Sequence, residues 1–379
     1  MLLLFFLKSL MNKWIVSLAL CGCIIFSSCG DKPQEENVFF DLKAMPSVSL
    51  TGELIEEDFF ACNTLQMAYI QSHLFHFEPT ENEVCLVTTE QADTVGFFSG
   101  IGGGPGEMIR PYYSGISENE DTIYVFDDMT KNLHKFSVQV KPNLVDYTLL
   151  ERKKLKENVD YLPENYIKET VFFLTRMENG YSIGYRVLTN GTLFALFDPD
   201  LNEVTKFGDY PIDEGMKDGE MRATSFFGGA MAVRDNSFFF ASHRFGYMVR
   251  YDISDHGEVT KAWNRWFTNP KCTFESNNLR FALENENGFY RLAIGKKYVY
   301  ATFSGVPMEE MFKQKNESAC VPRTLVVFDW NGNVKGKFNL NNSISALCLD
   351  SNEEYLYVKH KEPDVCLWRY KVSDILEHL

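Results

Sequence analysis

The most informative part of the sequence reads Asp121-Thr122-Ile123-Tyr124-Val125-Phe126-Asp127-Asp128 and continues after a short turn with Asn132-Leu133-His134-Lys135-Phe136-Ser137. Each run is rich in β-branched and aromatic residues and is bounded by Asp or Asn. Such runs are typical of β-strands, and the polar residues between them are typical of a turn. The stretch therefore predicts two neighbouring antiparallel strands.

The same pattern returns along the whole chain. Similar runs begin near residues 73, 122, 181, 237, 298 and 355, at intervals of 49, 59, 56, 61 and 57 residues. The further copies are His73-Leu74-Phe75-His76-Phe77, Tyr181-Ser182-Ile183-Gly184-Tyr185, Ser237-Phe238-Phe239-Phe240-Ala241, Tyr298-Val299-Tyr300-Ala301-Thr302 and Tyr355-Leu356-Tyr357-Val358-Lys359. A near-regular spacing of this kind indicates a repeat architecture.

Within a copy, one apolar run precedes the marked strand and two follow it. In the fifth copy, for example, Leu325-Val326-Val327-Phe328-Asp329 is followed by the turn Asn331-Gly332 and by Val334-Lys335-Gly336-Lys337-Phe338. Four antiparallel strands per repeat form the blade of a β-propeller. We therefore predict an all-β chain that forms a six-bladed β-propeller of four-stranded antiparallel blades over residues 38–379.

The sixth copy lacks its outer strand, because only residues 373–379 follow its third strand. A strand-like segment lies at the other end of the domain, within residues 38–50. An uncovered strand edge promotes aggregation, and ring closure removes it. We therefore predict that an N-terminal strand completes the last blade, and that deleting residues 30–50 lowers thermal stability severely.

The composition limits the function. The chain has 379 residues and a net charge of −15, with 45% hydrophobic and 15% aromatic residues. It is too apolar for a disordered chain and too charged for a multi-span membrane protein. The negative charge argues against nucleic acid as a partner, because phosphate binding needs clustered cations.

The first residues have the pattern of an export signal. Lys13 precedes the apolar run Trp14-Ile15-Val16-Ser17-Leu18-Ala19-Leu20, so residues 1–28 are predicted to be a signal peptide, with Met11 as an alternative start. Phe26-Ser27-Ser28-Cys29-Gly30 resembles a bacterial lipobox, in which Cys29 is lipidated. Residues 29–37 are then a polar tether.

A glycine-rich segment adds a family resemblance. The run Gly100-Ile101-Gly102-Gly103-Gly104-Pro105-Gly106-Glu107 lies near the first connection between blades. It lacks the Lys-Ser/Thr pair of a phosphate loop, which favours a tight turn. Together with the six repeats and the leader, it resembles the TolB-like and NHL-like six-bladed β-propeller lipoproteins of Bacteroidetes. That resemblance implies a cell-envelope lipoprotein, periplasmic or surface-facing at the outer membrane, that binds a protein, peptide or glycan.

No motif identifies catalytic residues, a metal site or a cofactor. The alternative function is a metal-dependent hydrolase or lyase of the lactonase-like propeller class, for which Glu107, Asp127, Asn190 and Glu284 are conceivable ligands. The cysteines after Cys29 form no CxxC pair, which favours buried thiols, although the export signal leaves disulfides open.

The sharper hypothesis is a ring of basic and aromatic residues on one face, because the loops that join blades and the loops after second strands share a face. A basic patch on an acidic protein would attract an anionic or sugar ligand; the alternative is solvated charge paired with nearby acids. The expected ligand-binding residues are Arg110, Tyr112, Tyr113, Arg186, Arg222, His243, Arg244, Arg280 and His360. The expected partners are the membrane, through the lipid, and one such ligand, and the protein is expected to be a monomer.

Overall fold

The computed structural model describes residues 39–57, 59, 66–77, 82–157, 170–187, 192–209, 228–275, 278–314, 321–340, 342–361 and 364–379. These residues belong to one compact unit, Val38–Leu379, whereas Met1–Asn37 forms a separate unit. The predicted signal peptide, Cys29 and the tether therefore lie outside the described residues.

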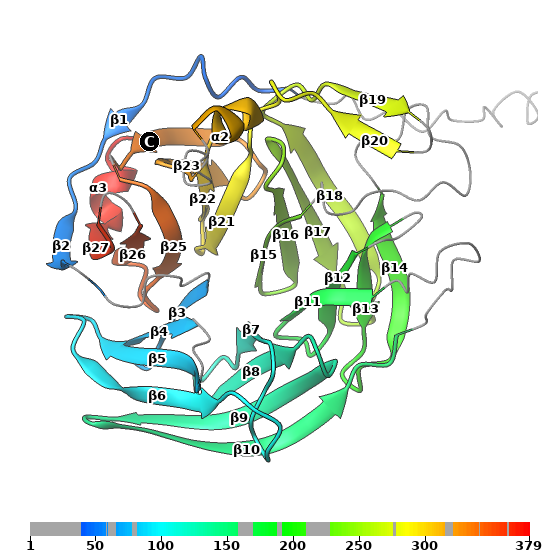
Figure 1. Cartoon of the computed structure of the whole chain (residues 1–379), viewed down its shortest axis with the longest axis vertical. Coiled ribbons are helices and arrows are strands. Elements are labelled where there is room, and N and C mark those ends of the chain that lie inside the picture. Colours follow the sequence, from blue (N-terminus) through cyan, green and yellow to red (C-terminus); the bar gives the residue numbers. More distant parts are fainter. Residues whose placement is uncertain are drawn as a thin grey trace, which may run out of the picture. The chain divides into compact units, whose positions relative to one another are not determined.

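The unit contains six blades of four antiparallel strands, arranged in a ring (Figure 1). Apart from the two short N-terminal strands at the outer edges of the fifth and sixth blades, the first strand of each blade in the sequence lies nearest the ring axis. The predicted six-bladed β-propeller is confirmed.

The first blade contains β3 (Gln66–Ile70), β4 (His73–Phe77), β5 (Glu83–Thr89) and β6 (Thr94–Gly100). The second contains β7 (Pro111–Ile116), β8 (Thr122–Asp127), β9 (Asn132–Lys141) and β10 (Leu144–Lys154), and the third β11 (Thr170–Arg176), β12 (Ser182–Val187), β13 (Thr192–Phe197) and β14 (Glu203–Asp209). The fourth contains β15 (Gly229–Arg234), β16 (Ser237–Ser242), β17 (Tyr247–Ile253) and β18 (Val259–Trp266).

The fifth blade contains β21 (Phe289–Ile294), β22 (Tyr298–Phe303), β23 (Thr324–Asp329) and β24 (Val334–Asn339), and the sixth β25 (Ile344–Leu349), β26 (Tyr355–His360) and β27 (Cys366–Lys371). Outside the blades lie the hairpin β19 (Cys272–Glu275) and β20 (Asn278–Phe281) and the helices α2 (Met308–Gln314) and α3 (Val372–Leu376). Helix α2 lies between the second and third strands of the fifth blade. The charged residues 149–154 belong to strand β10.

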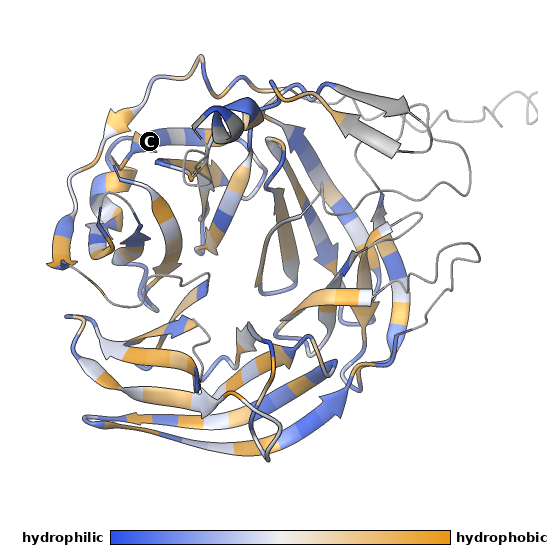
Figure 2. Cartoon of the chain, viewed as in Figure 1, coloured by the Kyte–Doolittle hydropathy of each residue, from blue (hydrophilic) through white to orange (hydrophobic). Residues whose placement is uncertain are grey.

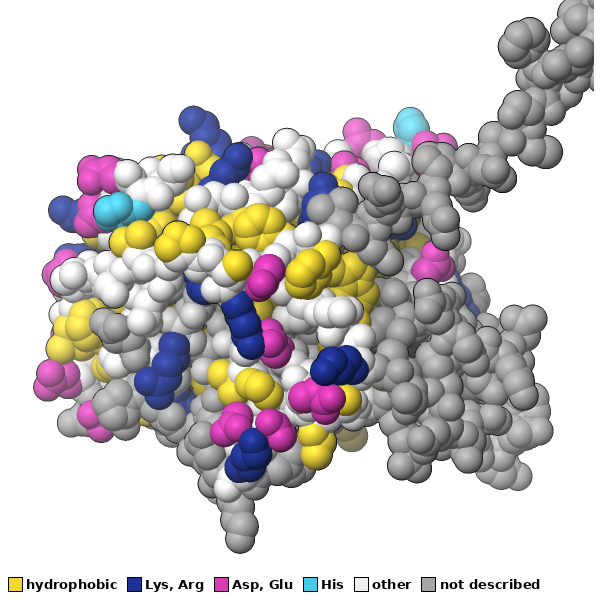
Figure 3. Space-filling view, turned by 90° about the horizontal axis from the view of Figure 1, so that it is seen from above, with side chains coloured by type: hydrophobic (Ala, Val, Ile, Leu, Met, Phe, Trp, Pro, Cys, Tyr) yellow, Lys and Arg dark blue, Asp and Glu magenta, His cyan; other side chains and the backbone are white. Residues whose placement is uncertain are grey.

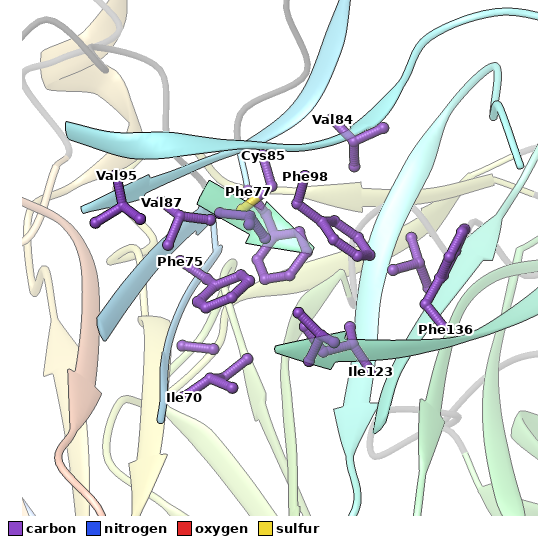
Figure 4. Packing of buried hydrophobic residues seen from close by; sticks show 14 of the residues in the cluster. Ile70, Phe75, Phe77, Val84, Cys85, Val87, Val95, Phe98, Ile123 and Phe136 are labelled. Carbon is purple, nitrogen blue, oxygen red and sulfur yellow. The ribbon is translucent and has the colours of Figure 1, made fainter. Parts of the chain in front are cut away.

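The hydrophobic core lies between neighbouring blades. Between the first and second blades, side chains of both sheets interlock around Phe75, Phe98 and Phe136 (Figure 4). The rings of Phe98 and Phe136 meet edge to face at 5.1 Å between centroids. The middle strand β16 is wholly buried, whereas the outer strand β18 mixes polar and apolar residues (Figure 2). Burial of these sheet faces explains the high aromatic content.

The ring is closed by an N-terminal strand, as predicted. Strand β2 (Glu53–Glu56) pairs antiparallel with β27 of the sixth blade, and Arg369 holds Glu53 through two hydrogen bonds of 2.8 and 2.9 Å. The predicted location, residues 38–50, needs correction. That segment contributes β1 (Val48–Ser49), which pairs parallel with β24 of the fifth blade.

Residues 39–56 thus run along the outer edges of three blades, and we call this segment the strap. It begins at the fourth blade, where the Phe40 amide donates to the Trp266 carbonyl at 2.8 Å. Leu42 is fully buried between the fourth and fifth blades, and the Lys337 ammonium donates to its carbonyl at 2.9 Å. The view from above shows basic, acidic and hydrophobic side chains interspersed over the described surface of this side (Figure 3). The strap therefore connects blades through both hydrophobic and polar contacts.

On one face of the ring, turns between first and second strands meet near the axis. The Gln71 amide donates to the Glu120 carboxylate at 2.6 Å, and the Ser351 hydroxyl also contacts Glu120. Glu353 accepts hydrogen bonds from Arg234 at 2.7 Å and from the Lys296 amide at 2.9 Å. The contacts of Ser351 with Glu120 and of Arg234 with Glu353 join blades that are not neighbours, so polar side chains cross-link this end of the ring.

Candidate functional site

The opposite face carries the predicted site. It is formed by the connections between blades and by the turns after second strands, and we call it the entry face, because the chain enters each inner strand there. Its best described connections are residues 101–110, 128–131, 243–246, 267–275 and 278–288. Several other connections on this face lie outside the described residues.

Four of the six inner strands carry a β-bulge. The register shifts after Tyr113 in β7, after Val171 in β11, after Phe289 in β21 and after Ile344 in β25. A bulge inserts an extra residue and changes the direction of the side chain there. The residues inserted at these shifts are Ser114, Phe172, Tyr290 with Arg291, and Ser345.

The inner strands also have an unusual charge composition. None of the six contains Asp or Glu, although the chain has 52 acidic residues. They contain three arginines, Arg176, Arg234 and Arg291. Arg234 pairs with Glu353, and Arg176 lies 4.8 Å from the centroid of the Tyr124 ring. The strands around the axis are therefore positively charged within an acidic protein.

Arg110 is held at the entry to the second blade. Its guanidinium pairs with Asp128, whose carboxylate also accepts from Lys131 at 2.5 Å. The same guanidinium lies 4.9 Å from the centroid of the Phe172 ring. Asp128 is buried, so the two cations neutralise a charge that would be costly alone. Arg110 is thus partly paired with an acid, as the alternative interpretation expected.

The neighbouring Asp127 organises the backbone of this connection. Although burial raises its pKa, hydrogen bonds from the Arg110 and Ile109 amides and from Thr130 hold the pKa below its usual value. Asp127 is therefore an ionised turn-stabilising group that already accepts at both oxygens.

The predicted tyrosines lie in β7 on the inner wall of the ring. Tyr112 meets Phe173 edge to face at 4.6 Å, and Tyr113 packs against Phe77 at 4.8 Å. The Tyr113 backbone exchanges hydrogen bonds with the Gln66 side chain, which ties β7 to β3. Burial raises the pKa of Tyr113, so its phenol is neutral. These residues form an aromatic wall that joins the first three blades.

A second group lies between the fourth and fifth blades. The ring of His243 stacks on Tyr290 at 5.1 Å between centroids and 18° between planes. Burial, and then the charge of Arg291, lower the pKa of His243 to about 3, and its Nε2 is buried without a hydrogen-bond partner. His243 is therefore neutral. Arg244, next in the same turn, makes no side-chain hydrogen bond within the described part of the chain.

Arg291 lies beside this pair. Its Nε donates to the Ser345 carbonyl at 2.7 Å, and its Nη1 donates to the Tyr290 carbonyl at 2.8 Å. No acidic residue of the described ranges pairs with it. Burial lowers its pKa to about 10, which still leaves the guanidinium charged at neutral pH.

Two predicted residues lie elsewhere than expected. Arg186 and His360 were placed in loops after second strands, but they belong to strands β12 and β26 and are buried. The Nη1 of Arg186 donates to the Thr192 hydroxyl at 3.3 Å. Nδ1 of His360 donates to the Ser343 carbonyl, and Nε2 accepts from the Tyr370 hydroxyl. Both ring nitrogens of His360 are therefore occupied within the protein.

For the remaining predicted site residues, the structure describes no side-chain geometry. Arg222 and Cys29 lie outside the described residues, and Arg280 is in β20, where side chains are not described. Among the described candidates, Arg110 and Tyr112 are brought together by Phe172 and Phe173, and His243 adjoins Arg244. No described contact joins these two groups to each other or to His360.

Gly288 determines how His243 meets β21. Its amide donates to the His243 carbonyl at 2.7 Å, and a Cβ at Gly288 would lie 1.7 Å from the Phe245 carbonyl oxygen. Because backbone blocks that position, Gly288→Ala should lower the free energy of unfolding by about 2 kcal/mol or more, measured by chemical denaturation. Gly103→Ala is the control, since a Cβ there meets nothing within 4 Å. Equal stability of the two variants would show that the close approach is unimportant.

The glycine-rich segment folds as a tight turn between the first and second blades. The Gly104 amide donates to the Glu107 carboxylate at 2.7 Å, and Gly106 has a φ of +81°. Glu284 pairs with Lys271 at 3.5 Å. Glu107, Asp127 and Glu284 are thus used locally, and Asn190 lies outside the described residues. No group of three or more His, Cys, Asp or Glu suited to a metal ion occurs in the described ranges.

Cys85, Cys348 and Cys366 are buried free thiols. For the described helices, none is both long and apolar enough to cross a membrane.

Comparisons with known proteins agree with this fold. Residues 267–352 match the family model described as TolB-like 6-blade propeller-like. A Bacteroides fragilis protein described as exported superposes with a TM-score of 0.54 and 10% identity, covering 88% of this chain and 98% of that one. A duf4221 family member from Bacteroides vulgatus superposes with a TM-score of 0.53 and 10% identity, covering 86% of this chain and 98% of that one. No curated protein matches the sequence.

The fold therefore defines the class: a six-bladed β-propeller, in which residues 267–352 are similar to the TolB-like 6-blade propeller family. The expected resemblance to TolB-like six-bladed propellers is confirmed.

Sequence reasoning missed Tyr290, Arg291 and Phe172. A bulge adds one residue to a strand without changing its apolar character, so the repeat pattern does not reveal it. One signal was present: Arg291 interrupts an otherwise apolar inner strand, Phe289–Ile294.

Proposed function

We propose that this protein is a lipid-anchored propeller of the cell envelope that binds a protein, peptide or glycan ligand at its entry face. The observation that carries the proposal is the composition of the entry ends of the inner strands, where Arg291 lies with the aromatic residues Tyr112, Phe172 and Tyr290 and no inner strand contains an acid, in a chain of net charge −15. Arg176 and Arg234 lie at the opposite ends of their strands. A cationic surface on an acidic protein focuses anionic ligands. Aromatic rings near it supply apolar contact area.

The cross-linked opposite face supports the choice of the entry face. Polar side chains of the turns already bind one another there, through Glu120 and Glu353. At the entry face, by contrast, Tyr112, Phe172, Tyr290 and Arg291 are partly exposed.

Export and lipidation are parts of the same proposal. The leader and Cys29 have the pattern of a lipoprotein, and one structural relative is described as exported. The strap begins at the rim of the fourth blade, ten residues after Cys29. Ten extended residues reach about 35 Å at most, so lipidation would keep the propeller close to the membrane. Metabolic labelling with a radioactive fatty acid should mark the parent and not a Cys29→Ala variant.

The alternative, a metal-dependent hydrolase or lyase, gains no support from the described carboxylates, because Glu107, Asp127 and Glu284 do not converge. Binding is therefore the better supported function.

The test is an array of peptides and of acidic and neutral glycans, probed with the mature protein. Tyr112→Ala combined with Phe172→Ala should weaken the strongest interaction at least about tenfold, because aromatic contacts dominate such sites. Tyr147→Ala, in the outer strand β10, is the matched control and should bind like the parent. If the double variant folds and binds like the parent, the entry face is not the binding surface.

A further inference from the structure

Among the described residues, Arg291 has neither an acidic partner such as that of Arg234 nor an aromatic ring such as that beside Arg176. A guanidinium has five N–H donors. Two of them are used, toward the Ser345 and Tyr290 carbonyls, and neither acceptor carries a full charge. The remaining donors have no acceptor among the described residues. Arg291 is partly buried, and a cation that loses part of its hydration without gaining an anion is unfavourable, so this site is electrostatically incomplete.

The two hydrogen bonds fix the guanidinium in place. They join the bulge of β21 to the bulge of β25, because Tyr290 and Ser345 are bulge residues. A fixed, planar group loses little conformational entropy when it binds a ligand. The Arg291 side chain is thus pre-organised at the inner wall.

The neighbouring groups narrow the chemistry of the ligand. His243 is neutral and stacked on Tyr290, which places a flat surface beside the cation. Nε2 of His243 lacks a partner. One guanidinium fork matches the two oxygens of one carboxylate, whereas phosphate sites usually add helix N-termini or further cations.

We propose that the ligand carries a carboxylate group on a six-membered ring, that Arg291 binds this carboxylate, and that the ring packs near Tyr290. This proposal rests on the function proposed above. Two sources share this chemistry, a uronic acid and an aromatic acid. The site lies between the fifth and sixth blades at the inner wall of the ring.

The test is isothermal titration calorimetry with two matched pairs of probes, glucuronate against glucose and benzoate against benzamide. The mature protein should prefer the carboxylate of at least one pair by about tenfold or more, and the pair that shows the preference identifies the source. Arg291→Met should abolish the preference, whereas Arg265→Met, in the outer strand β18, should retain it. A preference that survives in R291M, or no preference in the parent, overturns the proposal.

A second measurement covers the case in which R291M does not fold. In the parent, the carboxylate probe should shift the arginine Nε–H NMR signal that disappears in Arg291→Lys. An unshifted signal at saturating probe overturns the proposal as well. Failure here is separable from failure of the proposed function: array binding that depends on Tyr112 and Phe172 without any carboxylate preference would retain the function and discard the Arg291 site.

Discussion

Removal of the strap should destabilise the protein more than any other short deletion. Without residues 39–56, the sixth blade loses β2, the fifth loses β1, and the edges of β27 and β24 are uncovered. The deletion also removes Leu42 and Leu50, which are 0% and 7% exposed, from two separate hydrophobic clusters. Losing two buried leucines alone corresponds to at least about 4 kcal/mol. The melting temperature of the deletion variant should fall severely.

Point variants separate the contributions of the strap. Leu42→Ala should lower the free energy of unfolding by about 2–5 kcal/mol, because the side chain is fully buried among Phe239, Trp263 and Phe328. Val48→Ala is the matched control, since Val48 is 38% exposed and should change stability by less than about 1 kcal/mol. A strap deletion that melts within a few degrees of the parent would contradict the role of the strap in ring closure.

The second large effect is a loss of stability in mild acid. Burial lowers the pKa of His76 and His243 to about 3 and that of His360 to about 4. In the unfolded chain these imidazoles titrate near pH 6.5. Below that pH the unfolded state therefore binds protons that the folded state does not bind. Stability is therefore retained above pH 6.5 and lost as the pH falls. At pH 5, protonation of each of these histidines in the unfolded chain should lower the free energy of unfolding by about 2 kcal/mol.

The measurement is the free energy of unfolding by urea between pH 7.5 and 5. His76→Gln should reduce the loss over this range by about 2 kcal/mol, whatever its effect on stability at pH 7.5. His256→Gln, in the exposed turn after β17, should follow the parent profile. A parent protein equally stable at pH 7.5 and 5 would show that the buried histidines accept protons in the folded state.

The sequence was sufficient to predict the repeat, the blade and the count of six. These features arise from local alternation and turn residues, as in residues 121–137, which form β8 and most of β9. Closure of the ring by an N-terminal strand was predictable, but the position of that strand in the sequence was not. The short strand β2 has acids at both ends, and its partner Arg369 lies 316 positions away in the sequence.

The candidate site was only partly predictable, for physical reasons. Strands β12 and β26 extend to include Arg186 and His360, because partners elsewhere in the fold satisfy these polar side chains. The pattern of apolar residues cannot show those partners. The absence of acids from the inner strands is present in the sequence, but it becomes informative only when the six strands are known to surround one axis.

The most direct test of ligand binding at the entry face is hydrogen exchange measured by mass spectrometry, with and without the strongest ligand from the array. We predict that ligand slows exchange in peptides that contain residues 109–114 and 288–292, at the entry ends of β7 and β21, and leaves the outer strands β10 and β14 unchanged. Protection confined to β10 or β14, with none at the entry ends of the inner strands, would contradict the assignment of the binding surface.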